Sequence, residues 1–212
     1  RILGGITFSL GLVLVVVGGA ELFTGNLLLV MGWADRKIAT VALLRNWGVA
    51  YVGNLAGAVA MAVLAYWSGY MDLGSGAVGA TAVKIAAAKV ELDFTTAFVR
   101  GLLCNTLVCL AVWLCFAAHD VIGKIFAILF PITAFVALGF EHSIANMFFI
   151  PVGMLAAGND AYVAAASLTG GVGGLTFAGF MGNLVPVTLG NMVGGGLFVA
   201  GTYYLVYLRP HS

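Results

Sequence analysis

The chain has 212 residues, of which 62% are hydrophobic and only 8% are charged, and its formal net charge is +1. Soluble domains carry roughly a quarter charged residues. This composition therefore excludes an ordinary soluble globular protein and predicts a chain whose outer surface contacts lipid. The near-neutral charge gives no reason to expect a nucleic-acid partner.

Five apolar blocks are long enough to span a bilayer, which requires about 20 residues for each helix. They show no sustained two-residue alternation and are rich in Ala, Leu, Met, Phe and Gly, so helices are predicted rather than membrane strands. The sequence thus predicts an all-α integral membrane protein. The blocks cover approximately residues 2–33, 46–68, 97–117, 125–157 and 180–208.

The first and fourth blocks are too long for one simple span, and each contains a polar, glycine-containing break. The breaks are predicted at residues 18–26 and at residues 139–146, the second lying between Pro131 and Pro151. Non-helical backbone at membrane depth is tolerated only where protein or water satisfies its N–H and C=O groups. Each break is therefore expected to line a cavity.

Residues 34–45, 69–96, 118–124 and 158–179 are expected to be connecting loops. If the spans alternate in direction, most basic loop residues fall on one side of the membrane, and the positive-inside rule makes that side cytoplasmic. These basic residues are Arg36, Lys37, Arg45, Lys124 and Arg209.

The cysteines give no indication of a metal site. Cys104, Cys109 and Cys115 lie in one apolar block without metal-ligand spacing. They are expected to act as small hydrophobic residues, and no metal or cofactor is expected.

The two breaks belong to a repeated pattern of carboxylates and amides. The chain contains three Glu and eight Asn, and the repeat uses two of the Glu and six of the Asn. A duplicated polar pattern within apolar sequence indicates a polar pathway built from two related halves. The repeat pairs Glu21 with Glu141, Asn26 with Asn146, Asn46 with Asn183, and Asn54 with Asn191.

The repeat predicts one transmembrane channel domain over residues 1–212, with pseudo-repeats at approximately residues 1–68 and 97–208. Three spans begin between the two breaks, and this odd number inverts the second half relative to the first. The third block precedes the second break within its half. By symmetry a helix is expected before Arg1, giving six spans in a three-plus-three arrangement whose first helix is missing from this chain.

His142 is the most informative single residue. It lies in the second break beside Glu141, in the middle of an apolar block, where an ionisable group is costly and indicates function. Its side chain can change charge near neutral pH. The alternative is a neutral core histidine bonded to a backbone carbonyl.

Thr24 of the first break also has two interpretations. If the two breaks face each other, Thr24 can form a hydrogen bond with His142. Otherwise it is a threonine whose hydroxyl bonds within its own turn.

Other polar residues have two interpretations each. Lys89 collects anions at a vestibule or is a solvated loop charge. Asn105 lines the path or bonds another helix. Glu21 and Glu141 are expected to cap half-helix amides rather than carry protons. Several apolar residues either pack against lipid and the core or form constrictions that gate by dewetting. They are Phe8, Leu12, Leu22, Phe23, Val108 and Phe135.

The chain resembles the formate/nitrite transporter family, and the formate channels within it. The likeness covers nearly the whole chain, and its most specific element is Glu-His-Ser-Ile-Ala-Asn-Met at residues 141–147. It departs from a compared family member at residues 21–26, which read Glu-Leu-Phe-Thr-Gly-Asn in place of Asp-Leu-Phe-Thr-Ser-Thr. The matching segments are residues 4–12, 19–24, 46–47, 53–55, 105–113, 139–148 and 183–191.

The resemblance implies an aquaporin-like fold in a bacterial inner membrane, crossed several times, with five protomers that each contain a pore. It also implies roles for individual residues, with the first break as a gating loop. His142 and Thr24 would form the central pair, and Lys89 and Asn105 would line the outer vestibule. Phe8 and Phe135 would narrow one side of the central chamber. The other side would be narrowed by Leu12, Leu22, Phe23, Val108 and Asn191.

We therefore expect a channel or proton-linked transporter for small monovalent anions, formate first, in a lipid bilayer. Nitrite, hydrosulfide and other short monocarboxylates are alternative substrates, and a pore for neutral solutes is an alternative class. An intramembrane enzyme using His142 and Ser143 is disfavoured, since adjacent residues seldom form a nucleophile–base pair. No enzymatic activity is expected.

Overall fold

The computed structural model describes residues 1–209, which form helices and no strands. Four helices of this part of the chain are long and apolar enough to cross a membrane. The all-helical prediction is confirmed. The four are α3 (Thr40–Trp67), α5 (Phe94–Ala117), α6 (Val121–Leu138) and the continuous helix formed by α9 (Phe177–Met192), η3 (Val193–Gly201) and η4 (Tyr204–Leu208).

The first break separates α1 (Ile2–Val16) from η1 (Asn26–Leu28) and α2 (Leu29–Ala34). Residues 17–25 are non-helical, close to the predicted limits. Gly19 has a φ of +78°, a left-handed conformation that glycine adopts without strain. The chain can therefore reverse out of α1 and re-enter the protein at Thr24.

The second break is shorter than predicted. Only residues 139–142 lie outside helices, because α7 (Ser143–Ala156) begins directly after His142. The His142 ring starts this helix by accepting a hydrogen bond from the backbone N–H of Ala145, at 3.2 Å. The prediction that the break extends to Asn146 is wrong, since Asn146 lies within the first turns of α7.

Two of the expected loops contain helices, and a third is shorter than expected. Residues 69–96 hold η2 (Tyr70–Asp72) and α4 (Ala77–Val90), and residues 158–179 hold α8 (Asp160–Ala166). The alanine-rich sequence of α4 favours a helix, but its 14 residues are too few to suggest a span. α3 begins six residues before the predicted block, so Arg45 lies within a helix instead of a loop.

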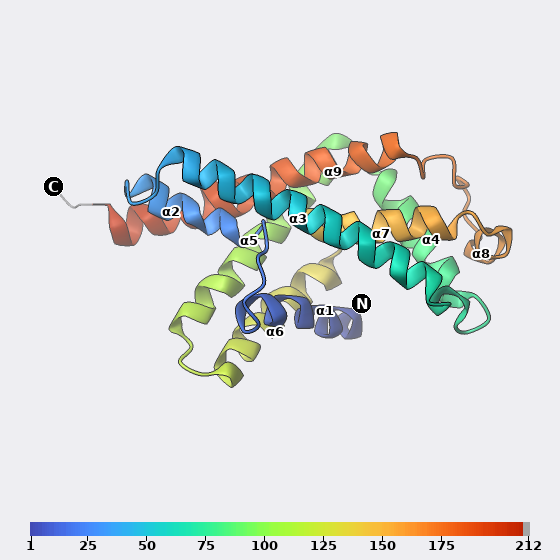
Figure 1. Cartoon of the computed structure of the whole chain (residues 1–212), viewed down its shortest axis with the longest axis horizontal. Coiled ribbons are helices and arrows are strands. Elements are labelled where there is room, and N and C mark those ends of the chain that lie inside the picture. The colour runs from blue at the N-terminus through green and yellow to red at the C-terminus, as the bar shows by residue number, and fades with distance from the viewer. Residues whose placement is uncertain (210–212) are drawn as a thin grey trace.

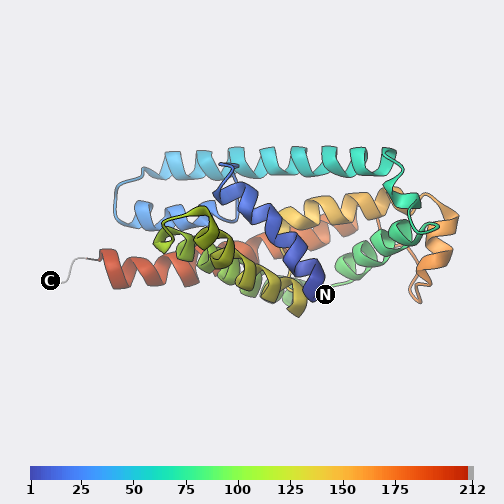
Figure 2. The ribbon, with the colours of Figure 1, turned by 90° about the horizontal axis from the view of Figure 1, so that it is seen from below.

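The long helices run along the longest axis of the molecule (Figure 1). α3 lies along one side of it, with α4 and α7 near its C-terminal end (Figure 2). α5 packs on α9, α1 packs on α6, and α7 packs on both α3 and α4. α1, α6 and the second half of α5 form a group that projects from the long axis (Figure 1). The two breaks lie where this group joins the rest of the molecule.

The α2–α3 connection, the α5–α6 connection and the end of η4 lie toward the same end of the molecule (Figure 1). We call it the basic end, because its residues include Arg36, Lys37, Lys124 and Arg209. The assignment of this end to the cytoplasm stays a prediction.

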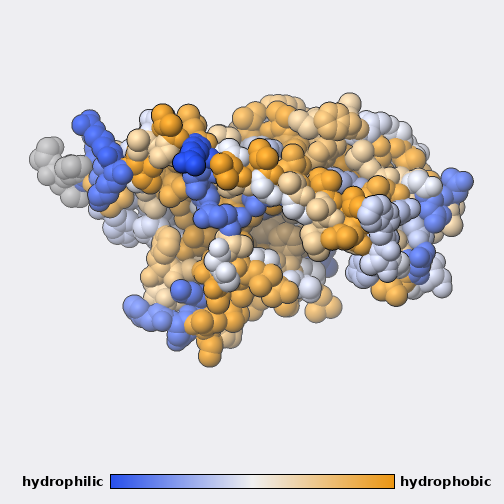
Figure 3. Space-filling model, in the orientation of Figure 1, coloured by the Kyte–Doolittle hydropathy of each residue, from blue (hydrophilic) through white to orange (hydrophobic). Residues whose placement is uncertain are grey.

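Apolar side chains cover most of the visible face (Figure 3). Hydrophilic ones gather at its two ends, on the lower projecting group and in one patch within the face (Figure 3). Val41, Val49 and Val52 of α3 are 78%, 67% and 63% exposed. Continuous apolar exposure on this scale is rare in proteins surrounded by water. The surface therefore suits contact with lipid or with other copies of the chain.

Candidate functional site

The two breaks meet at one hydrogen bond. Thr24 Oγ1 and His142 Nε2 are 2.9 Å apart, although the residues are 118 positions apart in the chain. Thr24 is fully buried and His142 is 6% exposed. The contact predicted between these two residues is present in the structure.

The hydrogen bonds of His142 determine which ring nitrogen carries the proton. Nδ1 accepts from the backbone N–H of Ala145. A neutral imidazole has one donor and one acceptor nitrogen, so Nε2 bears the proton and donates to the hydroxyl oxygen of Thr24. A second proton on Nδ1 would break the cap of α7 and place a positive charge at a helix N-terminus, where the helix dipole opposes it. In this arrangement the imidazole is neutral, and protonation of Nδ1 requires the hydrogen bond from Ala145 to break.

His142 lies on the wall of a cavity of approximately 190 Å³. It is the only polar side chain among the lining residues, and its ring stacks on Phe135 with 6.0 Å between centroids. Thr24 does not line this cavity; it is hydrogen-bonded to His142, which does. The lining residues are Phe8, Gly11, Leu12, Val15, Leu22, Val108, Ile132, Phe135, His142, Ile144 and Ala145.

Five of the seven residues predicted as constrictions thus lie around one space. Phe23 and Asn191 lie elsewhere. Phe23 is buried against Tyr51, with 4.9 Å between ring centroids. Asn191 is fully buried and accepts from Ser143 N at 2.9 Å. Their role in narrowing the pathway stays a prediction.

Sequence reasoning missed several members of this wall. Gly11 and Val15 lie one turn from Phe8 and Leu12 on α1, and Ile132 lies one turn before Phe135 on α6. Residues three or four apart share a helix face. Including the residues one helical turn before and after each predicted constriction residue would have identified them.

Lys89 is not a solvated loop charge. It lies in the last turn of α4, and its Nζ is 2.9 Å and 3.0 Å from the two carboxylate oxygens of Glu141. The side chains of Lys89 and Glu141 are 15% and 6% exposed. The ion pair compensates a carboxylate that would otherwise be buried without a counter-charge. That Lys89 also lines an outer vestibule stays a prediction.

Asn105 bonds other segments of the protein. Its Nδ2 donates to the carbonyl of Thr24 at 3.2 Å and to the carbonyl of Asn191 at 2.9 Å. Cys109 donates to the same Thr24 carbonyl, with a sulfur–oxygen distance of 3.4 Å. Asn105 is fully buried. It therefore connects the first break to α9. That Asn105 also lines the outer vestibule stays a prediction.

The repeat found in the sequence reappears as repeated hydrogen bonds. In the first copy, Asn26 Nδ2 donates to the carboxylate of Glu21 at 2.6 Å and to Asn46 Oδ1 at 2.9 Å. In the second copy, Asn146 Nδ2 makes the corresponding bonds at 2.6 Å and 2.7 Å. The partners in that copy are Glu141 and Asn183.

The last pair of the repeat, Asn54 and Asn191, also makes matching bonds. Asn54 donates to the backbone carbonyl of Glu21 at 2.9 Å, and Asn191 donates to that of Glu141 at 3.1 Å. Each Asn accepts, at 2.9 Å, from the backbone N–H two residues after its Glu. Each asparagine thus holds one break against the adjacent helix. The inverted relation of the two halves stays a prediction.

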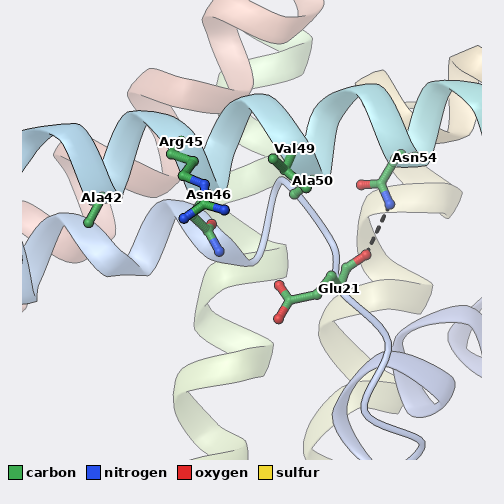
Figure 4. Close-up of a pocket in the computed structure, with 8 residues that line it drawn as sticks. Glu21, Ala42, Arg45, Asn46, Val49, Ala50 and Asn54 are labelled. Atoms are coloured by element: carbon green, nitrogen blue, oxygen red, sulfur yellow. Dashed lines mark hydrogen bonds between the residues drawn. The ribbon is translucent and has the colours of Figure 1, made fainter.

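The two carboxylates differ in their surroundings. Glu21 is exposed and lies beside a cavity of approximately 630 Å³ that Arg45 also lines. In Figure 4 the Glu21 carboxylate points into the space beneath α3, while its backbone carbonyl faces Asn54. Within residues 1–209, Glu21 forms no ion pair. No cluster of three or more His, Cys, Asp or Glu in this part of the chain could hold a metal ion.

Comparison with known proteins agrees with this architecture. A family model described as "Formate/nitrite transporter" matches residues 1–205. "Formate channel FocA" of Escherichia coli (strain K12) is 42% identical, with 100% of this chain and 76% of the relative covered. "Probable formate transporter" of Methanothermobacter thermautotrophicus is 45% identical, with coverage of 97% and 74%.

Two solved structures are also similar. "Pentameric formate channel with formate bound" has a TM-score of 0.85 and 39% identity, with 98% of this chain and 83% of that chain covered. "FNT family ion channel" has a TM-score of 0.80 and 33% identity, with coverage of 97% and 76%. The family resemblance seen in the sequence is confirmed, and the chain belongs to the formate/nitrite transporter family.

Proposed function

We propose that this protein is a channel for formate and similarly small monovalent anions, located in a bacterial inner membrane. We further propose that it forms a homopentamer in which each protomer has its own pathway. The names of its relatives and of the similar pentameric structure support both statements. The observation that carries the proposal is the His142–Thr24 pair at the wall of a small apolar cavity.

The cavity selects by size and by the cost of removing water. A hydrated anion must lose most of its shell to enter a space with one polar group, and a bare charge there costs several kcal/mol. The Nε2–H of His142 is a donor available to a carboxylate oxygen when Thr24 releases it. Formate that carries its own proton crosses at lower cost because it is neutral. Flux is therefore expected to rise as the pH falls.

The geometry does not support the enzyme alternative. Both ring nitrogens of His142 are engaged, one with Thr24 and the other with the backbone of Ala145. Neither is directed at the hydroxyl of Ser143, so the ring cannot activate it as a nucleophile. We propose no catalytic role for these residues.

The test is a flux assay on the purified protein in proteoliposomes. Formate, nitrite, hydrosulfide, acetate and glycerol are compared at about pH 5.5 and about pH 7.5. We expect formate flux well above that of protein-free vesicles, and an electrical conductance carried by anions. Passage of glycerol or water without anion conductance would instead identify a pore for neutral solutes.

A further inference from the structure

We propose that Lys124 is an anion-collecting residue in a second cavity, which forms the entrance to the His142 cavity from the basic end. This inference rests on the proposed function, because it extends the same pathway. The second cavity has a volume of approximately 430 Å³. Its lining residues are Val15, Val16, Leu22, Gly25, Asn26, Leu28, Leu29, Met31, Val112, Cys115, Phe116 and Lys124.

The second cavity adjoins the His142 cavity. Both are lined by Val15 of α1 and Leu22 of the first break. These two side chains therefore form the wall between the spaces. Leu22 lies in the non-helical segment two residues before Thr24. A solute moving between the cavities must pass Leu22, and a small displacement of this segment would open the way.

Lys124 is the one lining residue of this cavity that carries a full charge at neutral pH. It lies in the first turn of α6 and is half-buried. Its backbone carbonyl accepts from Cys115 Sγ at 3.7 Å, which joins the end of α5 to the start of α6. The backbone that carries the lysine is therefore held at the rim of the cavity.

The charge of Lys124 is not neutralised within the described part of the chain. Over residues 1–209, the ion pairs are Lys37 with Asp35 and Lys89 with Glu141. Asp120, one turn before Lys124, accepts from the backbone N–H of Gly123 at 2.6 Å. A lysine without a carboxylate partner at a low-dielectric cavity raises the local concentration of anions.

The other polar lining groups are already engaged. Asn26 Nδ2 donates to Glu21 and Asn46, and Cys115 donates to the backbone of α6. Among the side chains that line this cavity, Lys124 is therefore the donor that remains available to an anion. The ligand class is a small monovalent anion, which the lysine attracts as a point charge and then passes to the apolar wall at Leu22.

The test compares Lys124→Gln and Lys124→Glu with Lys37→Gln. The control removes the same charge from the same end, at an exposed lysine that is paired with Asp35. Uptake of formate is measured in proteoliposomes of known orientation at about 10 mM and at about 500 mM salt. Size-exclusion profiles and unfolding temperatures show whether each variant is folded.

At low salt we expect Lys124→Gln to lower formate entry from the basic end by about threefold to tenfold, and Lys124→Glu to lower it further. The loss should appear as a higher apparent KM for formate and should be small for entry from the opposite end. It should also shrink at high salt, because salt screens the charge of the lysine. Lys37→Gln should behave as the wild type.

Two results would overturn the inference. One is low-salt entry through Lys124→Gln equal to that of the wild type, which would leave the proposed function intact. The other is an equal loss in both directions at both salt concentrations, because that would indicate a structural role. A wild-type protein that carries no formate would contradict the proposed function itself.

Discussion

The two breaks share one framework of hydrogen bonds but are held with different strength. In the second break, Glu141 is paired with Lys89, and Asn183 also donates to the backbone carbonyl of Lys89 at 2.8 Å. In the first break, Glu21 has no ion pair within residues 1–209, and the non-helical segment is longer. The contacts around the second break therefore hold His142 more firmly than those around the first break hold Thr24.

This difference indicates which side of the central pair can move. His142 is part of the start of α7 and is supported by the ion pair next to it. Thr24 is held by single hydrogen bonds from His142, Asn105 and Cys109. A hydrogen bond contributes about 1 kcal/mol, whereas breaking a buried ion pair costs about 3–5 kcal/mol. Movement of the first break is thus the less costly route to opening.

The largest effect is expected from removing Lys89. Lys89→Met leaves the Glu141 carboxylate buried without a counter-charge and should lower the free energy of unfolding by about 3–5 kcal/mol. Denaturation in detergent measures it. Lys84→Met, an exposed change on the same helix, is the control and should have little effect. Adding Glu141→Gln to Lys89→Met should restore part of the loss. If Lys89→Met and Lys84→Met are equally stable, the second break does not depend on the ion pair.

The matched asparagines allow a direct comparison of the two copies. Asn191 is fully buried, whereas Asn54 is half-exposed. Asn191→Leu leaves buried backbone groups without partners and should cost about 1–3 kcal/mol per group, while Asn54→Leu should cost less because water reaches its partners. Thermal unfolding of both variants measures the difference. Equal losses would mean that the two copies are held equally well.

A glycine in η3 tests how the first break is held near Thr24. A Cβ on Gly195 would overlap Asn105 Nδ2 and lie 2.7 Å from Cys109 Sγ, the two groups that bond the Thr24 carbonyl. Gly195→Ala should therefore cost about 1–3 kcal/mol and alter formate flux by displacing the first break. Gly182→Ala is the control, since a Cβ there meets no atom within 4 Å. Wild-type flux and stability in Gly195→Ala would show that this packing does not position Thr24.

The smallest effect concerns the start of α5, outside the membrane spans. Side-chain and backbone hydrogen bonds from Thr96 lower the pKa of the Asp93 carboxyl below its ordinary value of 3.8. Because the folded-state pKa is lowered, the stabilisation is present above the ordinary pKa and is lost as the pH falls through the lowered value. The stability difference between the wild type and Asp93→Ala should shrink between about pH 5 and about pH 2. A difference that is constant over this range would contradict a charged cap.

Much of the site could be predicted because its polar residues follow a spacing that occurs twice in the sequence. Glu21 and Glu141 are rare carboxylates in apolar sequence, and their common spacing to an asparagine predicted two related breaks. The meeting of Thr24 with His142 followed from the expectation that the breaks face each other. Part of the apolar wall was predicted only through the resemblance to the family, which implied that Phe8, Phe135 and Leu12 narrow the pathway.

Other features depend on contacts between distant segments and could not be predicted. The early start of α7 depends on a hydrogen bond from the backbone of Ala145 to a ring nitrogen, which no spacing reveals. The partner of Lys89 is 52 positions away in the chain. α4 was mistaken for a loop because a 14-residue helix is too short to cross a membrane by itself. Its small buried residues become interpretable only when α7 lies against them.

The most direct test of the central claim is the pH dependence of formate flux through His142→Asn. Asparagine can still cap α7 but does not titrate, so folding is kept while the imidazole is removed. We predict a changed pH profile between about pH 5 and about pH 8 and a changed preference for formate over larger anions. A pH profile and an anion preference identical to those of the wild type would contradict the claim that solutes pass His142.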